Sequence, residues 1–555
     1  MGFATVADRY SPDDIARFYE SGQWKPDTLF EMLQAQVAAQ PDRVFITDDH
    51  QALTFTEMRD QAIAFAAGLH ARGIAAGDRV AVQMPNWVEF GAIAAGLSRL
   101  GAIMVPIMPI YRRDEVSFIG ANADIKAAVI APEFRKFDYA QMYAELHGEI
   151  PSRRDIILLR TEPGAHDGSF TRYDDVLADG AGASADDLGP GVGPDDPIVI
   201  VFSSGTTARP KGCLHTFNTL ACGSRMLAKG WDYSPQDVQF GPSPVTHMTG
   251  LVTSIILPMM HGAPTHIMEQ WIPELAVGQI KDHSCSVAVT ATTFLQTLLD
   301  AYDPDVHDLS SLRVWTCAGS PIPAAIVERA KQALPQLTVL SLYGRTENVT
   351  TTMCTVRDPY ERSLTSDGAP LPLQSVKIVD DDGVEVPRGE EGDIAYRGAM
   401  HMLEYIHNPQ ETAKLFTSEG YSRSGDLGRM DENGFVRVTG RTKDIVIRGG
   451  MNISVRQVED LLSHHPAIRD AAAVAMPDER LGEKVCLYAV PAPGHEDVTL
   501  AEISDYLLGH AVAIQKVPER LELIGALPMT ASGKVQKHVL RSMIADKLAQ
   551  EAAAR

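Results

Sequence analysis

A strand-like apolar run that enters a loop of small polar residues constrains this chain more than any other feature. Residues Ile198–Phe202 are all β-branched or aromatic, and they lead directly into Ser-Ser-Gly-Thr-Thr-Ala-Arg-Pro-Lys-Gly at Ser203–Gly212. Backbone amides and hydroxyl groups in such a loop can surround phosphate oxygens, and Lys211 adds a charge that could neutralise pyrophosphate. Pro210 stands where a Walker loop has its second glycine, so this is not a Walker loop. The candidate phosphate-binding residues are Ser203, Ser204, Gly205, Thr206, Thr207 and Lys211.

Upstream of the loop, helical and strand-like segments alternate. Helical stretches at Phe55–Gly73 and Trp87–Leu100 are followed by strand-like runs at Asp78–Met84 and Ala102–Pro106. This rhythm predicts an α/β fold in which helices flank a parallel sheet. Residues 161–197 are rich in Gly, Asp and Ala, and we expect them to form a surface connection.

The last 110 or so residues are predicted to form a separate unit. A helix is expected near Val455–His464, with strands at Ala471–Met476 and Lys484–Val490. We place the boundary near Lys443. The predicted architecture is a large N-terminal domain of several parallel-sheet subdomains, residues 1–442, and a small, mobile C-terminal α+β domain, residues 443–555.

Composition excludes several classes of function. Of 555 residues, 49 are Lys or Arg and 72 are Asp or Glu, so the net charge of −23 argues against a nucleic-acid partner. Six dispersed cysteines form no CxxC pair, which predicts reduced, buried thiols and a cytoplasmic protein. Met1–Tyr10 shows no signal-peptide pattern, and the apolar stretch Phe90–Pro109 is interrupted by Ser98 and Arg99. No integral membrane segment is therefore expected.

Four further motifs accompany the phosphate loop in a fixed order. They are Ala318-Gly319-Ser320, Tyr343-Gly344-Arg345-Thr346-Glu347, Ser424-Gly425-Asp426-Leu427 with Arg441 after it, and the C-terminal run Pro528–Lys537, which contains Lys534. Together with the loop, they resemble the motifs of the adenylate-forming superfamily, which comprises acyl-CoA synthetases, peptide-synthetase adenylation domains and firefly-type luciferases. The resemblance covers the chain from about residue 30 to 541.

The resemblance implies an ATP site. Tyr343 would stack on adenine, with the turn at Ala318–Ser320 on its other face. Thr346 would lie near the α-phosphate, Gly344 of the same motif would also belong to the nucleotide site, and Glu347 would hold Mg²⁺. Hard oxygen ligands suit that ion. Asp426 and Arg441 would bind the ribose.

The resemblance also implies two half-reactions. Lys534 would contact the substrate carboxylate and the α-phosphate during adenylation, and rotation about a hinge at Lys443 would then exchange the catalytic face. The turn Gly449-Gly450 would line a pantetheine tunnel. His247, in Pro-x-x-His-x-x-Gly, would lie where the acyl pocket meets that tunnel.

Two positions depart from the usual pattern. Ala208 replaces a common glycine and is expected to stiffen the phosphate loop. Arg345 occupies the variable position of its motif, and it could pair with a substrate carboxylate or, as we favour, with a neighbouring acid.

The predicted function is that of an AMP-forming acyl-CoA ligase with ATP, Mg²⁺ and coenzyme A. The acid is expected to be alicyclic, medium-chain or aryl, because Met108–Arg113 and the His247 motif are similar to bacterial cyclohexanecarboxylate and medium-chain ligases, and Tyr19–Trp24 to aryl-acid ligases. The acyl pocket is expected to be lined by His247, Thr290–Phe294, Trp315, Ala318–Ser320 and Tyr343–Thr346. Transfer to a carrier protein is the alternative. Self-association into a homodimer is left open.

Overall fold

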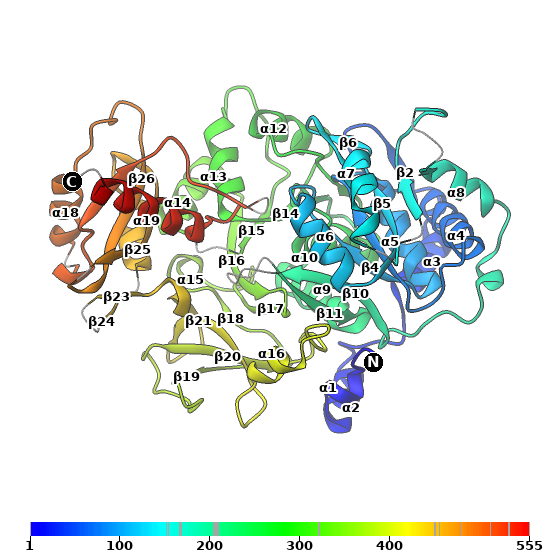
Figure 1. Cartoon of the computed structure of the whole chain (residues 1–555), viewed down its shortest axis with the longest axis horizontal. Coiled ribbons are helices and arrows are strands. Elements are labelled where there is room, and N and C mark those ends of the chain that lie inside the picture. The colour runs from blue at the N-terminus through cyan, green and yellow to red at the C-terminus, as the bar shows by residue number, and fades with distance from the viewer. Residues whose placement is uncertain are drawn as a thin grey trace.

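The protein has the mixed α/β architecture predicted from its sequence (Figure 1). The computed structural model describes residues 2–150, 152–153, 155–165, 169–203, 210–319, 322–448, 451–453, 455–478, 480–510, 512–530 and 533–553. Two large sheets, a four-stranded sheet and the two-stranded pair β6 (Glu133–Phe134) with β7 (Phe137–Asp138) lie in the N-terminal part of the molecule, and a five-stranded sheet forms the C-terminal part.

The sheet that carries the phosphate-loop strand has seven strands. In spatial order they are β11 (Lys211–Thr216), β10 (Pro197–Ser203), β4 (Ile103–Pro106), β3 (Arg79–Gln83), β5 (Ile125–Ile130), β8 (Asp155–Leu158) and β9 (Thr171–Arg172). All neighbouring pairs are parallel except β10 with β11. The predicted helices are α4 (Phe55–Ala71) and α5 (Glu89–Leu100), and residues 103–106 form the predicted strand that follows α5.

A nine-stranded sheet places the Tyr343 motif. Its order is β18 (Ala369–Pro370), β17 (Asn348–Met353), β16 (Thr338–Arg345), β15 (Val314–Ala318), β14 (Val287–Thr290), β12 (Gln239–Phe240), β13 (Thr265–His266), β1 (Val44–Thr47) and β2 (Ala52–Thr54). The central strands are parallel, and β16 with β17 forms an antiparallel hairpin. Helices α9 (Phe217–Trp231), α13 (Thr292–Ala301) and α14 (Ala324–Ala333) surround these strands.

The third sheet is antiparallel and carries Asp426 and Arg441. Its strands are β19 (Gln374–Val379), β20 (Gly392–Gly398), β21 (Ser422–Met430) and β22 (Val436–Arg441). Asp426 and Arg441 are opposite one another in the β21–β22 register.

The C-terminal part has hydrophobic clusters of its own, whose members all lie between Val446 and Leu548. Its sheet consists of β24 (Met451–Ile453), β23 (Val446–Arg448), β26 (Gly482–Pro491), β25 (Ile468–Asp478) and β27 (Arg520–Leu523), with helices α17 (Arg456–Leu462), α18 (Leu500–Gly509) and α19 (Lys537–Ala553). A short 3₁₀ turn, Thr442–Asp444, joins β22 to β23. We propose the domain boundary in this turn; its position at residues 442 and 443 stays a prediction.

One prediction was wrong in part. The 161–197 region contains strand β9 and helix α8 (Tyr173–Asp179), so it is not only a surface connection. Tyr173 and Val176 are buried, and the Val176 backbone lies against Gly68 of α4. Tyr173 and Val176 are spaced three apart, as on one face of a helix, but α8 has only seven residues in an otherwise acidic and glycine-rich stretch. This segment is too short for a helical pattern to be recognised in the sequence.

The N-terminal segment packs against the third sheet. Helices α1 (Val6–Arg9) and α2 (Pro12–Glu20) precede Trp24, which is buried and donates from Nε1 to the Ala399 carbonyl at 3.1 Å. The Tyr10 hydroxyl donates to the His401 carbonyl at 2.5 Å. Figure 1 shows these helices beside α16 (Pro409–Lys414).

All six cysteines lie in the described part of the chain and are buried with free thiols, as predicted. Among the described residues, no helix combines the length and the apolar character needed to cross a bilayer.

Candidate active site

The predicted motifs converge on one cavity of about 840 Å³. Its walls come from the end of β10, the β16–β17 turn, the segment before α10 (Met248–Gly250), strands β21 and β22, and the C-terminal loop that carries Lys534. A second cavity of about 470 Å³ adjoins it behind Tyr343 and Gly319, and it extends between the N-terminal and C-terminal parts.

The β16–β17 turn places an ionised carboxylate in the large cavity. Its glycine is required, because a Cβ on Gly344 would lie 2.2 Å from the Val349 carbonyl oxygen. The Glu347 side chain is only 7% exposed, and it accepts a hydrogen bond from the Tyr405 hydroxyl at 2.6 Å. Burial raises the pKa of Glu347, but the charge of Arg345 and the Tyr405 hydrogen bond outweigh it and lower that pKa to about 2. Glu347 is therefore an anion at neutral pH.

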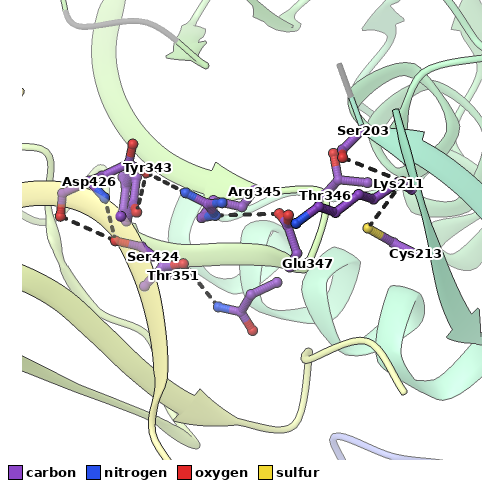
Figure 2. Close-up of polar contacts among 12 residues, drawn as sticks. Ser203, Lys211, Cys213, Tyr343, Arg345, Thr346, Glu347, Thr351, Ser424 and Asp426 are labelled. Atoms are coloured by element: carbon purple, nitrogen blue, oxygen red, sulfur yellow. Dashed lines mark hydrogen bonds and ion pairs between the residues drawn. The ribbon is translucent and has the colours of Figure 1, made fainter. Parts of the chain in front are cut away.

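Arg345 bridges two buried acids, as expected from the sequence (Figure 2). Its Nε lies 3.3 Å from Glu347 Oε2, and its Nη1 lies 2.8 Å from Asp426 Oδ2. Both acids keep their charge because one guanidinium lies between them.

Asp426 has three partners. Its Oδ2 also accepts from the Tyr343 hydroxyl at 2.7 Å, and its Oδ1 lies 3.0 Å from Arg441 Nε. Burial raises the pKa of Asp426, and the charges of Arg345 and Arg441 reverse this and lower it. The predicted adenine-stacking and ribose-binding residues thus form one charged cluster.

Lys534 reaches this cluster from the C-terminal part of the chain. It lines both cavities, and a Cβ added to Gly319 would lie 2.5 Å from Lys534 Cε. Gly319 also has a φ of +78°, so a side chain there would be strained as well as crowded. Burial, and then the charge of Arg441, lower the pKa of Lys534 to about 8. The Thr293 hydroxyl donates to the carbonyl of the preceding residue, Gly533, at 3.3 Å.

The ends of the phosphate loop are fixed by a hairpin. Ser203 and Lys211 are paired across β10 and β11, and the Ser203 hydroxyl donates to the Lys211 carbonyl at 3.4 Å. Lys211 Nζ donates to Glu411 Oε2 at 2.5 Å and lies over the Tyr405 ring. Ser204, Gly205, Thr206, Thr207 and Ala208 of the loop, Ser320, and the Gly449-Gly450 turn lie outside the described residues.

His247 lies at the apolar end of the large cavity. Its Nδ1 accepts from the Thr249 amide at 3.3 Å, so the proton of the neutral ring sits on Nε2. Burial, and then the charge of Lys534, lower the pKa of His247 to about 3, which makes the ring neutral at physiological pH.

The acyl-pocket prediction needs correction. Trp315 is fully buried and donates to Thr290 Oγ1 at 2.8 Å, so it packs behind the cavity instead of lining it. Residues 290–294 likewise support Gly533 from outside the cavity, and Tyr343 lines the adjoining cavity. The apolar wall instead consists of Leu227, Met248, Val252, Val289, Leu342 and Val349. Leu227 and Val252 lie on helices that are almost entirely buried, so the sequence does not distinguish these pocket residues from ordinary core residues.

Two supporting residues had no sequence signal. Tyr405 holds Glu347 from 58 positions away. His215 is buried, and burial lowers its pKa to about 4, so its neutral ring donates from Nε2 to the Thr346 carbonyl at 2.7 Å. His215 thereby fixes the backbone of Thr346, which lines the cavity.

Comparisons with known proteins identify the family. The model of the AMP-binding enzyme family matches residues 33–406, and that of the AMP-binding enzyme C-terminal domain matches residues 457–534. The chain belongs to the AMP-binding enzyme family.

Two relatives and one solved structure illustrate the family's range. A medium-chain fatty-acid–CoA ligase of Escherichia coli (strain K12) is 33% identical over 97% of this chain and 94% of its own. A Mycobacterium tuberculosis (strain H37Rv) protein described as salicyl-AMP ligase / salicyl-S-ArCP synthetase is 31% identical, over 96% and 93%. The crystal structure of the anthranilate CoA ligase AuaEII with anthranoyl-AMP shares the fold, with a TM-score of 0.85, 23% identity, and coverage of 96% and 98%. The chain is thus an ATP-using, adenylate-forming enzyme, an AMP-forming acid–thiol ligase.

The cavity of this AMP-binding enzyme also fits a magnesium ion. Mg²⁺ in nucleotide sites is commonly held by one or two carboxylates together with substrate phosphates. Glu347 supplies one buried, ionised carboxylate on the cavity wall. No group of three or more potential metal-ligating side chains occurs among the described residues, so a cage made only of protein ligands is not found there.

Proposed function

We propose that this protein is an AMP-forming acyl-CoA ligase for an apolar carboxylic acid. The observation that carries the proposal is the position of Lys534, which lines one cavity together with the Asp426–Arg441 pair, the apolar wall and His247. A cation in such a cavity suits a reaction in which a carboxylate meets a phosphate.

In the proposed first step, a carboxylate oxygen of the acid attacks the α-phosphorus of ATP. The new P–O bond replaces the bond to the bridging oxygen, and pyrophosphate leaves. Both reactants are anions, so positioning and charge neutralisation supply most of the catalysis. Lys534 would neutralise the meeting oxygens, and Lys211, Ser203 and the loop beyond Ser203 would hold the leaving phosphates. No general base is needed, because the acid is already ionised at neutral pH.

Other residues in this proposal bind the nucleotide. Tyr343 and the Ala318-Gly319 turn would enclose adenine, Asp426 and Arg441 would hold the ribose, and Thr346 would contact the α-phosphate. Glu347 would hold Mg²⁺, which when bound supplies positive charge against the phosphate oxygens.

In the proposed second step, the thiol of CoA attacks the acyl-adenylate carbonyl. The C–S bond forms, the C–O bond to AMP breaks so that AMP leaves, and the thiol proton passes to solvent water. The Lys443 hinge would turn the C-terminal domain so that Lys534 leaves and the Gly449-Gly450 turn lines the thiol path. His247, neutral and buried beside the apolar wall, would orient the reacting carbonyl.

The pocket supports an acid with an apolar body. Leu227, Met248, Val252 and Val349 offer aliphatic contacts, and Thr249 and Thr253 add only neutral hydroxyls. A medium-chain, alicyclic or aryl monocarboxylic acid fits this chemistry. An acid with a second charged group at its far end would lose its hydration there without gaining a partner.

A carrier protein is the second candidate for the thiol. The M. tuberculosis relative, named for both salicyl-AMP and salicyl-S-ArCP, favours this alternative as much as the E. coli relative favours CoA. Both routes share the adenylation step.

The test is pyrophosphate release with ATP, Mg²⁺ and a panel of apolar acids, with and without CoA. We expect many turnovers only when CoA is present, with an acyl-CoA product. A single equivalent of pyrophosphate per enzyme that CoA does not change would reject the CoA-ligase proposal in favour of a carrier protein.

A further inference from the structure

The charge balance around Arg345 is a feature that the proposed function does not use. Arg345 contacts Glu347 and Asp426, the two carboxylates proposed to hold Mg²⁺ and the ribose. Its side chain is 21% exposed, whereas those of Glu347 and Asp426 are 7% and 5% exposed. Figure 2 shows the guanidinium lying between the two acids.

Both contacts lie in the way of the ligands. Glu347 Oε1 accepts from Tyr405 and Oε2 lies next to Arg345, so a metal ion that binds Oε2 would compete with the guanidinium. Asp426 Oδ1 is paired with Arg441, and Asp426 Oδ2 is shared by Tyr343 and Arg345. A ribose hydroxyl that binds Asp426 Oδ2 would therefore compete with the Arg345 guanidinium. A cation and a guanidinium cannot both take Glu347 Oε2 at full strength.

We propose that Arg345 is an exchangeable counter-ion that shares Glu347 with the metal. It keeps both carboxylates paired and aimed into the cavity, and it yields Glu347 when Mg²⁺ arrives with ATP. Mg²⁺ and Arg345 are then partly redundant: each supplies the positive charge that lets a buried carboxylate face a triphosphate.

The released guanidinium has a use in adenylation. Resting on the proposed function, Arg345 would stay paired with Asp426 through Nη1 while Mg²⁺ balances the charge of Glu347, so its Nε would be free to face the substrate carboxylate and the α-phosphate. Arg345 would thereby be a positioning residue for the first half-reaction, with no part in the second.

The direct test is ATP binding to the full-length protein by isothermal titration calorimetry, without any acid. The dissociation constant for ATP is measured once with EDTA and once with saturating Mg²⁺. The value with EDTA is divided by the value with Mg²⁺, and this ratio is compared between variants. In Arg345→Met this ratio should be at least tenfold larger than in the wild type, because metal-free ATP then meets Glu347 without its counter-ion, whereas Asp426 keeps Arg441. Arg345→Lys, which keeps the charge, should fall between them. A ratio in Arg345→Met no more than twice that of the wild type would overturn the proposal.

Two further measurements separate this inference from folding and from the proposed function. If Arg345→Met does not fold, Arg345→Gln removes the charge but keeps donors for the two acids, and the same ratio applies. In the half-reactions, Arg345→Gln should slow pyrophosphate release at least tenfold but leave thioester formation from supplied acyl-adenylate within threefold. Equal losses in both steps would overturn the positioning role, whereas a wild-type enzyme that makes no acyl-CoA would reject the proposed function and leave the calorimetric result standing.

Discussion

At the scale of single residues, the site centres on a group of charged side chains that line one cavity: Arg345, Glu347, Asp426, Arg441 and Lys534. The sequence predicted which residues would gather there, because each belongs to a motif with fixed internal spacing. It did not predict Tyr405, whose contact with Glu347 joins residues 58 positions apart, or the wall residues Leu227 and Val349. Such contacts depend on how β16 and the segment after β20 are stacked, and no local pattern encodes that stacking.

The lowered pKa of Lys534 gives a pH prediction. Lys534 acts as a cation, so its contribution is present below a pKa of about 8 and is lost as the pH rises through it. We expect kcat/KM for pyrophosphate release to fall about tenfold per pH unit above this value. In Lys534→Arg the profile should be lower but flat over the same range, since arginine stays charged. A wild-type profile that stays level well above pH 8 would contradict the assignment.

Tyr405 gives a second prediction at this scale. Tyr405→Phe removes the hydrogen bond to Glu347, and hydrogen bonds to charged groups are worth roughly 1.5–3 kcal/mol. We expect the Mg²⁺ concentration for half-maximal activity to rise about tenfold or more, because Glu347 is no longer held in place, and the free energy of unfolding to fall by no more than roughly 3 kcal/mol. The control is Tyr421→Phe, which removes a hydroxyl that is hydrogen-bonded to Ser375 at the surface. Equal Mg²⁺ dependence in the two variants would remove Tyr405 from the site.

At the scale of elements, the longer and more regular segments were predictable and the short ones were not. Helices α4 and α5 and strands β3, β4 and β10 are apolar segments whose alternation along the chain could be recognised, whereas α8 was missed. The sequence Asp381-Asp382-Gly383 lies between two apolar runs and is typical of a hairpin turn. The structure has a turn there, closed by backbone hydrogen bonds from Asp380 to Val384 and from Val386 to Ile378, but the long ladder partner of β19 is β20. A turn signal alone does not determine which strand completes the sheet.

The N-terminal segment contacts the loop that carries Tyr405, because Tyr10 and Trp24 donate hydrogen bonds to carbonyl groups of that loop. Trp24 is 1% exposed and packs against Tyr10 and Phe18, with ring centroids 5.3 and 5.1 Å away. We expect Trp24→Ala to lower the free energy of unfolding by about 3–5 kcal/mol, measured by urea denaturation. Ile110→Ala, at an exposed position, should change it by less than about 0.5 kcal/mol. A small loss in Trp24→Ala would mean that the N-terminal segment is not part of the folded core.

At the scale of the whole molecule, the C-terminal part is held with Lys534 inside the cavity by contacts between distant segments. Arg456 of α17 donates to the Val438 carbonyl and lies 3.9 Å from Asp367, and Gln296 donates to Asp470 at 3.4 Å. The sequence predicted two parts and their order, but not this arrangement, because these contacts link residues that no motif relates.

The turn at Thr442–Asp444 is where we expect rotation to occur. Lys443→Pro fixes φ there and should spare pyrophosphate release while lowering thioester formation at least tenfold. Lys443→Ala leaves the backbone free and should behave as the wild type in both assays. Normal overall turnover in Lys443→Pro would remove the domain-rotation proposal.

The most direct test of the central claim is to separate the two half-reactions in Lys534→Ala. Pyrophosphate release from ATP and acid, and thioester formation from supplied acyl-adenylate and CoA, are measured beside a control, Lys547→Ala, which removes an exposed lysine paired with Glu522. We predict that Lys534→Ala loses pyrophosphate release by at least a hundredfold and keeps thioester formation within threefold, while the control matches the wild type in both. If the two half-reactions fall together in Lys534→Ala, Lys534 is not the residue that serves adenylation alone, and the central claim is wrong.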